Sequence, residues 1–393
     1  MFGQKTYIMA AMLGIVAMTA GCAKMSEGSR IDDDLVPVTF STYSLRSTGT
    51  KADAGFVGPG GDFATGAVVG VYGFYHDNST WAAETAAGTN IADFMYHTAL
   101  TKQSDGSWDY SPVKYWPNEF GMGANSTNID RLSFWAYYPR NAAGLNLYKP
   151  GTTTPYDNDT NGLPSASFVV NSDITKQVDL MFTEAQTDLY KSQSHDVDGG
   201  GTDNYGFLPN GEVTLKLRHA LSLVQFNVVS DGGSLPDDAE IVITDLTLTN
   251  IKTTGTCADP SASFADEAAA ATYWTNVSTP VNMVVPTEAV GSYGSMLVLM
   301  PQTLEQDGAT GHSLVKLTLT YDIRFPAAHN PSEYISYSDN TAEKYLWMDG
   351  AGAYGVKRWL PGRRYVYNLE AGLERIEFSE VTEASWTEEW NEE

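Results

Sequence analysis

The chain has 393 residues, of which 48 are acidic and 23 basic, giving a formal net charge of −25. A surface this acidic repels nucleic acid and anionic lipid, so nucleic acid is excluded as a partner. Aromatic residues make up 12% of the chain, glycine occurs 36 times, and helical periodicity is scarce. Together these features predict an all-β protein.

The first 21 residues have the pattern of an export signal. Lys5 precedes an apolar stretch from Tyr7 to Met18, and small residues lead up to Cys22. This stretch is too short and wrongly flanked for a membrane span, so we expect a signal peptide that is removed. The tetrapeptide TAGC at 19–22 resembles a bacterial lipoprotein signal, which implies a lipid on Cys22 and membrane attachment through it. A plain secretory leader is the alternative, because Thr19 stands where such signals usually carry Leu.

The chain has only two cysteines, Cys22 and Cys257. A lipid on Cys22 would leave a single thiol and no intramolecular disulfide. An exported protein without disulfides must be held together by a large hydrophobic core, and this chain is long enough to form one.

The first predicted strand follows the tether. Val36, Val38 and Phe40 alternate with polar residues or proline, which is the period of a half-buried strand. A polar loop after it carries two basic residues, Arg46 and Lys51. A first strand lying between an anchor and a cleavable loop could be removed after folding, with its three apolar residues acting as the fillers of a groove.

Short strands separated by turn residues continue along the chain. We predict strands around residues 68–75, 132–138, 178–182, 213–229, 241–251, 315–325, 365–369 and 376–381, and a short helix within 264–274. The 241–251 strand should contain a phase slip near Asp245. Two blocks of such strands predict two antiparallel β-sandwiches in series. The Gly/Asp-rich stretch 191–211 marks the boundary between them.

These features divide the chain into four predicted parts. They are a lipoprotein signal peptide at 1–21, a tether and removable first strand at 22–55, an N-terminal β-sandwich at 56–208, and a C-terminal β-sandwich with a short acidic tail at 209–393.

Two short stretches match the spelling of cofactor or metal motifs, but the residues around them do not fit such a site. Residues 350–355 spell GxGxxG, but a turn follows where a dinucleotide site needs a helix. Residues 157–162 begin like a calcium loop, but Phe168 occupies the twelfth position, where a glutamate is required. The six histidines lack paired metal-ligand spacing, and no GxSxG is present. We expect no enzyme activity, no cofactor and no metal.

An ordered set of segments resembles the fimbrillin family, the type V pilins and pilus-associated proteins of the Bacteroidia. The segments are TFSTYS with TKADAGF (39–44 and 50–56), VVGVYGFY (68–75), LSFWAYYP (132–139), VDLMFTEA (178–185), LKLRHALSLVQFNV (215–228), LMPQTL (299–304) and WLPGRRYVYNL (359–369). Each is weak alone, since most consist of strand-core residues and a turn; their order and the lipoprotein-like leader make the set more specific.

The resemblance implies two tandem transthyretin-like β-sandwich domains, export as a lipoprotein to the outer membrane, and assembly into a surface fimbrium. It also implies that an outer-membrane trypsin-like protease cuts after the first strand, and that a strand of another pilin subunit fills the vacated groove. Arg46 matches such a cut best in this sequence, and Lys51 is the alternative.

The resemblance leaves the role in a pilus open. Stalk pilins carry a C-terminal donor extension, whereas residues 372–393 are short and acidic here, which favours a tip or accessory subunit. The competing hypotheses are a pilus anchor and a surface lipoprotein that binds a host protein or glycan without polymerising.

Overall fold

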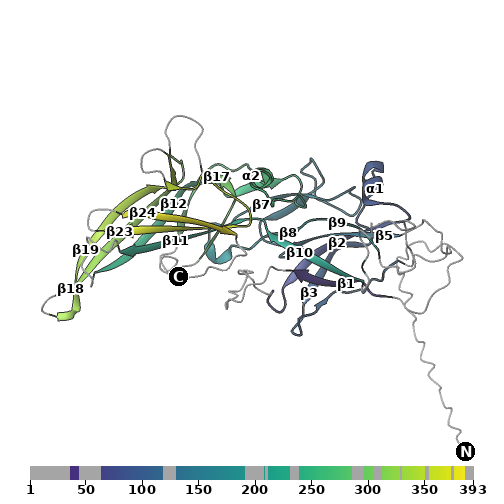
Figure 1. Cartoon of the computed structure of the whole chain (residues 1–393), viewed down its shortest axis with the longest axis horizontal. Helices are drawn as coiled ribbons and strands as arrows, with labels where there is room; N and C mark the ends of the chain where they lie inside the picture. Colours follow the sequence, from purple (N-terminus) through teal and green to yellow (C-terminus); the bar gives the residue numbers. More distant parts are fainter. Residues whose placement is uncertain are drawn as a thin grey trace, which may run out of the picture.

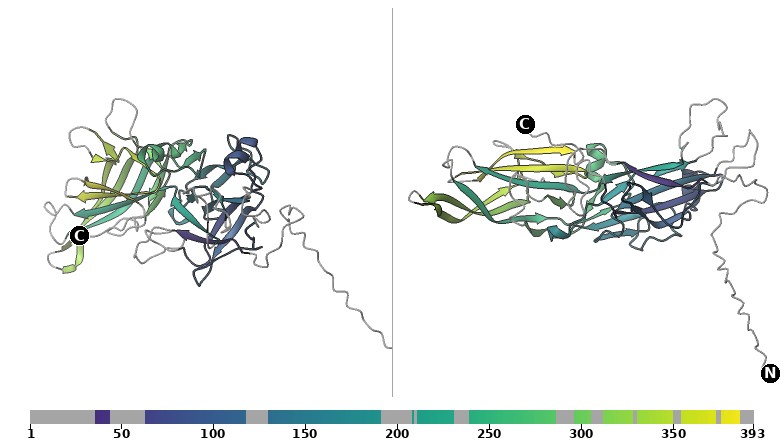
Figure 2. Two further views of the ribbon diagram at one scale, coloured as in Figure 1. Left: turned by 45° about the vertical axis from the view of Figure 1, so that its right-hand side comes forward. Right: turned by 90° about the horizontal axis from the view of Figure 1, so that it is seen from below.

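The computed structural model describes residues 36–43, 63–117, 130–190, 208, 211–230, 239–285, 296–304, 312–327, 330–349, 354–372 and 376–385. Within these residues the regular structure is mostly β-strand, with two short α-helices and one 3-10 turn, which confirms the predicted all-β class. Figures 1 and 2 show an elongated molecule whose sheets follow one another along its long axis.

The strands are numbered in chain order. In the first part of the chain they are β1 Thr39–Tyr43, β2 Val68–His76, β3 Met95–Lys102, β4 Trp108–Asp109, β5 Arg131–Tyr138, β6 Leu145–Tyr148, β7 Ser165–Val169, β8 Met181–Thr183, β9 Gln186–Leu189 and β10 Glu212–His219. The remaining strands are β11 Ser222–Ser230, β12 Glu240–Ile251, β13 Thr254–Cys257, β14 Thr275–Asn276, β15 Val281–Val285, β16 Leu297–Leu299, β17 Gln302–Thr303, β18 Lys316–Ala327, β19 Asn330–Tyr345, β20 Trp347–Met348, β21 Tyr354–Gly355, β22 Arg358–Trp359, β23 Arg363–Ala371 and β24 Ile376–Ser385.

Four larger sheets and two small ones contain these strands. One sheet has eight strands in the order β1-β10-β8-β5-β2-β3-β4, with β9 paired to β5. Two four-stranded sheets, β16-β11-β23-β24 and β15-β12-β18-β19, form the other end of the molecule (Figure 1). The sheet β14-β13-β7-β6 joins strands from both halves of the sequence, and the two-stranded sheets are β17-β22 and β20-β21.

Two pairings depart from the expected antiparallel pattern. β1 pairs with β10 in parallel, and β11 pairs with β23 in parallel. Two parallel strands must be joined by a long connection, and well over a hundred residues separate the two members of each pair, so both can run in parallel. The alternation of apolar and polar residues within a strand does not show whether its partner runs parallel or antiparallel.

Several local predictions are confirmed. The register of β12 against β18 shifts between Ile243 and Asp245, where the sequence predicted a phase slip. Helix α2 (Glu267–Tyr273) lies within the predicted helical stretch, and its Asp266 cap accepts a hydrogen bond from the Ala269 N–H at 2.8 Å. Helix α1 (Trp81–Ala87) and the 3-10 turn Ile174–Lys176 were not predicted.

Strand pairing crosses the predicted domain boundary. β10 begins just after residue 208, yet it pairs with β8 and β1 in the eight-stranded sheet. The division into two sandwich domains at that residue remains a prediction.

Two hydrophobic cores hold the sheets together. The larger cluster draws residues from both halves of the sequence. The smaller one lies on the eight-stranded sheet and includes Val38 and Phe40 of the first strand segment. Among the residues that the structure describes, no helix has the length and apolarity needed to cross a membrane.

Candidate functional site

The first strand is bonded along both of its edges. On one side β1 pairs with β10, from Thr39 opposite Glu212 to Tyr43 opposite Lys216. On the other side the Val38 N–H donates to the Lys114 carbonyl at 2.9 Å, and the Trp116 N–H donates to the Val36 carbonyl, also at 2.9 Å. The segment 36–43 therefore lies in a slot between β10 and residues 114–116.

Two side chains on the inward side of this strand are almost completely buried. Val38 is 1% exposed and Phe40 5%, whereas Pro37 and Thr39 face solvent. The Phe40 ring packs edge-on against Tyr110 and Phe134, with centroid separations of 5.6 and 5.4 Å. The other members of the same core cluster are Phe63, Val69, Val71, Met95, Leu100, Trp108, Trp116, Leu132, Ala136, Met181, Leu189, Val213, Leu215 and Leu217.

Polar side chains also reach across to the strand. The Tyr110 hydroxyl donates to the Val38 carbonyl at 2.8 Å, and burial raises the pKa of this hydroxyl. Trp108 donates its indole N–H to Thr42 Oγ1 at 3.2 Å, and Ser41 and Thr214 share a hydrogen bond of 3.2 Å between their hydroxyls. Side chains in the wall of the slot are thus hydrogen-bonded to the strand.

Replacing Tyr110 with Phe should lower the free energy of unfolding by about 1 kcal/mol. The ring would still pack on Phe40, but the hydrogen bond to the Val38 carbonyl would be lost. Urea denaturation of both proteins measures the difference. The matched control is Tyr96→Phe, which removes a similar tyrosine hydrogen bond, to the Tyr156 carbonyl, away from the slot. An unchanged free energy of unfolding in Tyr110→Phe would contradict the role of this hydroxyl in holding segment 36–43.

Removing the strand and leaving the slot empty would cost free energy of folding. Without the strand, β10 would lose one edge of hydrogen bonds, and Val213, Leu215 and Phe134 would lose cover. Each large apolar side chain exposed costs about 1.5–3 kcal/mol, and an open strand edge is a template for pairing with another strand. The arrangement can therefore hold a strand and, once vacated, accept one of similar alternation.

The remaining predicted site residues lie outside the described residues. These are Cys22, Arg46 and Lys51. Of the predicted groove fillers, Val36 is half-buried against the smaller core, and Val38 and Phe40 belong to it. Only two residues separate Arg46 from Tyr43, where β1 ends.

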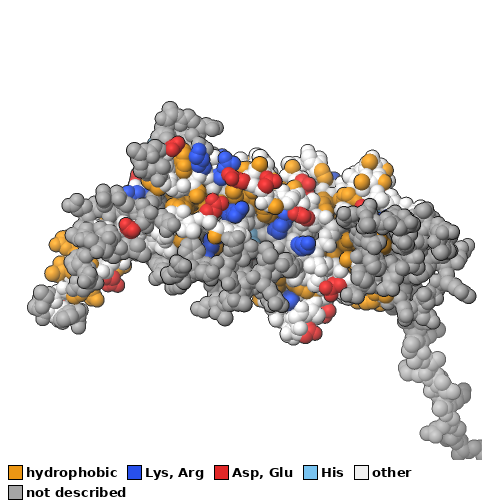
Figure 3. All heavy atoms as spheres, in the orientation of Figure 1, with side chains coloured by type: hydrophobic (Ala, Val, Ile, Leu, Met, Phe, Trp, Pro, Cys, Tyr) orange, Lys and Arg blue, Asp and Glu red, His pale blue; other side chains and the backbone are white. Residues whose placement is uncertain are grey.

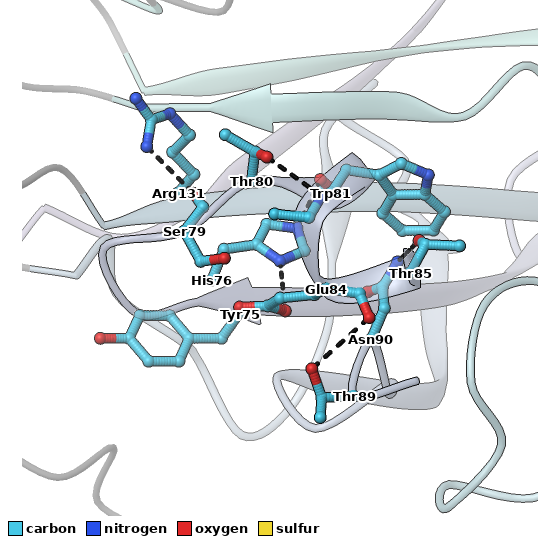
Figure 4. Close-up of polar contacts among 12 residues, drawn as sticks. Tyr75, His76, Ser79, Thr80, Trp81, Glu84, Thr85, Thr89, Asn90 and Arg131 are labelled. Atoms are coloured by element: carbon cyan, nitrogen blue, oxygen red, sulfur yellow. Dashed lines mark hydrogen bonds and ion pairs between the residues drawn. The ribbon is translucent and has the colours of Figure 1, made fainter. Parts of the chain in front are cut away.

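A second polar arrangement was not predicted from the sequence. His76, at the end of β2, is hydrogen-bonded to Glu84 of α1 at 2.8 Å (Figure 4). Its other ring nitrogen is hydrogen-bonded to the Ser133 hydroxyl of β5, also at 2.8 Å. This order of groups resembles a hydrolase triad, but His76 and Ser133 are 0% exposed, and the Ser133 hydroxyl also accepts the Asp188 N–H at 3.0 Å. A serine enclosed in this way cannot meet a substrate, so the contacts attach α1 to the sheet.

Two aspartates beside this network are held in partly buried positions. Burial raises the pKa of both Asp93 and Asp130. Asp93 accepts the Tyr75 N–H at 3.0 Å, and Asp130 accepts the Asn78 N–H at 3.1 Å.

These raised pKa values predict a pH dependence of stability. Between the unfolded pKa, about 3.9, and the higher folded pKa, each of these two carboxyls binds more protons in the native state, so their contribution to stability should fall as pH rises from about 4. The free energy of unfolding, measured by urea titration from pH 3.5 to 6.5, should lose part of this slope in Asp130→Asn and in Asp93→Asn. Equal slopes in the wild type and in both variants would contradict the prediction.

A buried histidine, the second cysteine and the calcium-like loop each have ordinary structural contacts. His219 is buried and bonded to Asp179 at 2.8 Å, and burial raises the pKa of the Cys257 thiol to about 12. Asp157, in the loop that begins like a calcium site, is ion-paired with Lys149 at 2.6 Å. Within the described ranges, no three His, Cys, Asp or Glu side chains are grouped to hold a metal.

Known proteins resemble this one over most of its length. A family model described as fimbrillin-like matches residues 50–386. The crystal structure of a fimbrial protein from Bacteroides vulgatus ATCC 8482 aligns with a TM-score of 0.54 at 17% identity, covering 89% of this chain and 99% of that one. The tip fimbrial protein Mfa3 from Porphyromonas gingivalis, with a C-terminal truncation, aligns with a TM-score of 0.36 at 11% identity, covering 81% and 95%. No curated protein matches the sequence.

Proposed function

The chain belongs to the fimbrillin-like family, and on that basis we propose that it is a type V pilus subunit assembled by exchange of its first strand. Membership makes it a pilus-related protein of the cell surface with a structural role and not an enzyme. The finer proposal is that it is exported as a lipoprotein through Cys22, cut after Arg46 or Lys51 by a trypsin-like outer-membrane protease, and then joined to another subunit.

The observation that carries this proposal is the slot around residues 36–43. The strand is the first described part of the chain, is bonded along both edges, and supplies Val38 and Phe40 to a core otherwise built from residues beyond it. A basic residue follows it closely in the sequence. Removal of such a segment leaves a specific vacancy without dismantling β2, β5 and β10.

Physical chemistry supports strand replacement after the cut. A donor strand with apolar residues at alternate positions restores both the hydrogen bonds on β10 and the buried contacts, which is β-augmentation. The contact is head-to-tail, since the groove of one subunit takes a strand from another, and a head-to-tail contact that does not close produces a filament.

The test is the N-terminus of the protein as it stands on the cell surface. We expect Ser47 as the first residue in assembled material, and Arg46→Ala should shift the cut to Lys51 or abolish it. Lys51→Ala is the matched control and should leave Ser47 as the first residue. An acylated Cys22 retained in assembled fibres, or unchanged processing in the double variant Arg46→Ala/Lys51→Ala, would overturn the proposal.

One observation favours a second function, a surface lipoprotein that binds a host protein or glycan. Tyr334, Ile335 and Tyr337 of β19 are 53%, 55% and 59% exposed. Hydrophobic side chains gather at this end of the β18–β19 hairpin (Figure 3), which lies at the far end of the molecule from β1 (Figure 1). The two functions are distinguished by the same N-terminal analysis, because a non-polymerising lipoprotein keeps its acylated Cys22.

A further inference from the structure

A short strap closes the outer side of the slot around the first strand. The strap consists of residues 110–117, none of which belongs to a strand of a sheet. Within the described part of the chain it meets the first strand in one isolated bridge, between Pro37 and Tyr115. On the opposite side of the slot, β10 pairs with β1 from Thr39 to Tyr43. The two sides of the slot are therefore built differently.

The β10 side of the slot is fixed and the strap side is not. The second edge of β10 pairs with β8, and its side chains Val213 and Leu215 are 0% exposed. Moving β10 would therefore break the eight-stranded sheet and open its core. The strap carries less buried surface, since Val113 and Tyr115 are 50% and 44% exposed. Opening the slot by moving the strap breaks fewer contacts, and segments with few buried contacts are the ones that open locally.

One buried side chain fastens the strap. Trp116 is 5% exposed and belongs to the smaller core, and its indole N–H donates to the Gly211 carbonyl at 2.9 Å. The same carbonyl accepts the Thr39 N–H of the first strand at 3.4 Å. The backbone N–H of Trp116 donates to the Val36 carbonyl, also on the strand, at 2.9 Å. Trp116 thus joins the strap both to the strand and to the residue that precedes β10.

The other bonds between the strap and the strand use backbone groups of the strand. The Lys114 N–H donates to the Tyr110 hydroxyl at 3.2 Å, and that hydroxyl donates to the Val38 carbonyl at 2.8 Å. The Val38 N–H donates in turn to the Lys114 carbonyl at 2.9 Å. Every residue except proline has this donor and this acceptor. A closed strap can therefore bond in the same way to a replacement strand of a different sequence.

We propose that the strap is the moving side of the slot: residues 110–117 swing outward while β10 stays in place, and Trp116 sets how often they do so. Release of the first strand and entry of another strand both pass through the strap side. The strand that enters is identified by the function proposed above, on which this part rests, whereas the opening itself is a property of the uncut chain.

Amide hydrogen exchange tests the opening in the uncut protein expressed without residues 1–21. The variant Trp116→Phe keeps a large ring in the core and loses the bond to the Gly211 carbonyl. We expect the amides of Val38 and residue 116 to exchange about fivefold faster in the variant, the factor equivalent to one ordinary hydrogen bond, while the amides of β10 keep their rates. Unchanged rates at Val38 and residue 116, or an equal increase in β10, would overturn the proposal, because the strap then does not open by itself.

A matched control removes an indole N–H from another wall of the slot. Trp108, on β4, is 7% exposed and donates to Thr42 Oγ1 of the first strand at 3.2 Å. Trp108→Phe removes this bond and leaves the bonds of the strap in place, so the amides of Val38 and Trp116 should exchange at the wild-type rate. An acceleration equal to that in Trp116→Phe would overturn the role of Trp116, since any weakened contact with the strand would then act alike.

The rate of strand exchange shows whether the strap is the route of entry. In a protein nicked after the first strand, Trp116→Phe should take up an added peptide of residues 35–44 about fivefold faster than the unsubstituted protein, because the same opening limits both processes. An equal rate of uptake would overturn the strap as the route. Failure of the unsubstituted nicked protein to take up any peptide would instead contradict the proposed function, and the amide rates of the uncut chain would still decide whether the strap opens.

Discussion

Replacing Phe40 with Ala should lower the free energy of unfolding by about 3–5 kcal/mol, the range for a buried phenylalanine in a packed core. Phe40 is almost completely buried and its ring contacts Tyr110 and Phe134, so truncation would leave a cavity between the first strand and the sheet. Urea denaturation of the protein expressed without residues 1–21, followed by intrinsic fluorescence, measures the change.

The matched control for this variant lies next to it in the chain. Thr39 is on the same strand but faces solvent, so Thr39→Ala should change the free energy of unfolding by less than about 0.5 kcal/mol. A loss below about 1 kcal/mol for Phe40→Ala would mean that the first strand contributes little to the core. The strand could not then be the element whose removal drives assembly.

A chain cut in the loop after the first strand should exchange that strand for an added peptide. We expect a synthetic peptide of residues 35–44 to replace the native segment in a protein nicked at an engineered site between Ser47 and Thr50. The vacated slot offers the β10 edge and the apolar wall that hold Val38 and Phe40 in the intact chain. Mass spectrometry of the complex, with an isotopically labelled peptide, follows the replacement.

The specificity of this exchange is tested with a variant peptide. Changing Val38 and Phe40 of the peptide to Asp should weaken binding at least about a hundredfold, because two buried apolar contacts worth about 1.5–3 kcal/mol each are lost. Changing the solvent-facing Thr39 to Asp should have little effect. Equal binding of the three peptides would show that exchange does not use the inward face of the strand, and uncut protein should take up none of them.

Much of the local structure could be predicted because it depends on neighbouring residues. The alternation at 36–40 separates the buried Val38 and Phe40 from the exposed Thr39, since successive side chains of a strand point to opposite faces. The slip near Asp245 and the helix behind Asp266 were predictable for the same reason. Helix α1 carried a similar signal that was missed: Thr80 caps its start, and Gly88, in the left-handed conformation, ends it.

The site itself could be predicted only in part. Sequence pattern identified the strand and its inward residues, but nothing near Val38 indicates that Tyr110 and Lys114 would bond to it. The hydrogen-bonded network of Ser133, His76 and Glu84 could not be predicted either, because its members come from two strands and a helix and form no short sequence motif. Only their shared burial showed that the serine cannot serve as a nucleophile.

The sequence by itself determined that this is an acidic, β-rich chain whose first strand has one apolar face, since composition and a period of two are local properties. Tertiary structure alone decided that β1 lies parallel to β10 and that β11 lies parallel to β23. Strand direction depends on which distant segments meet. That choice is settled by the packing energy of the whole molecule, and no short stretch of residues encodes it.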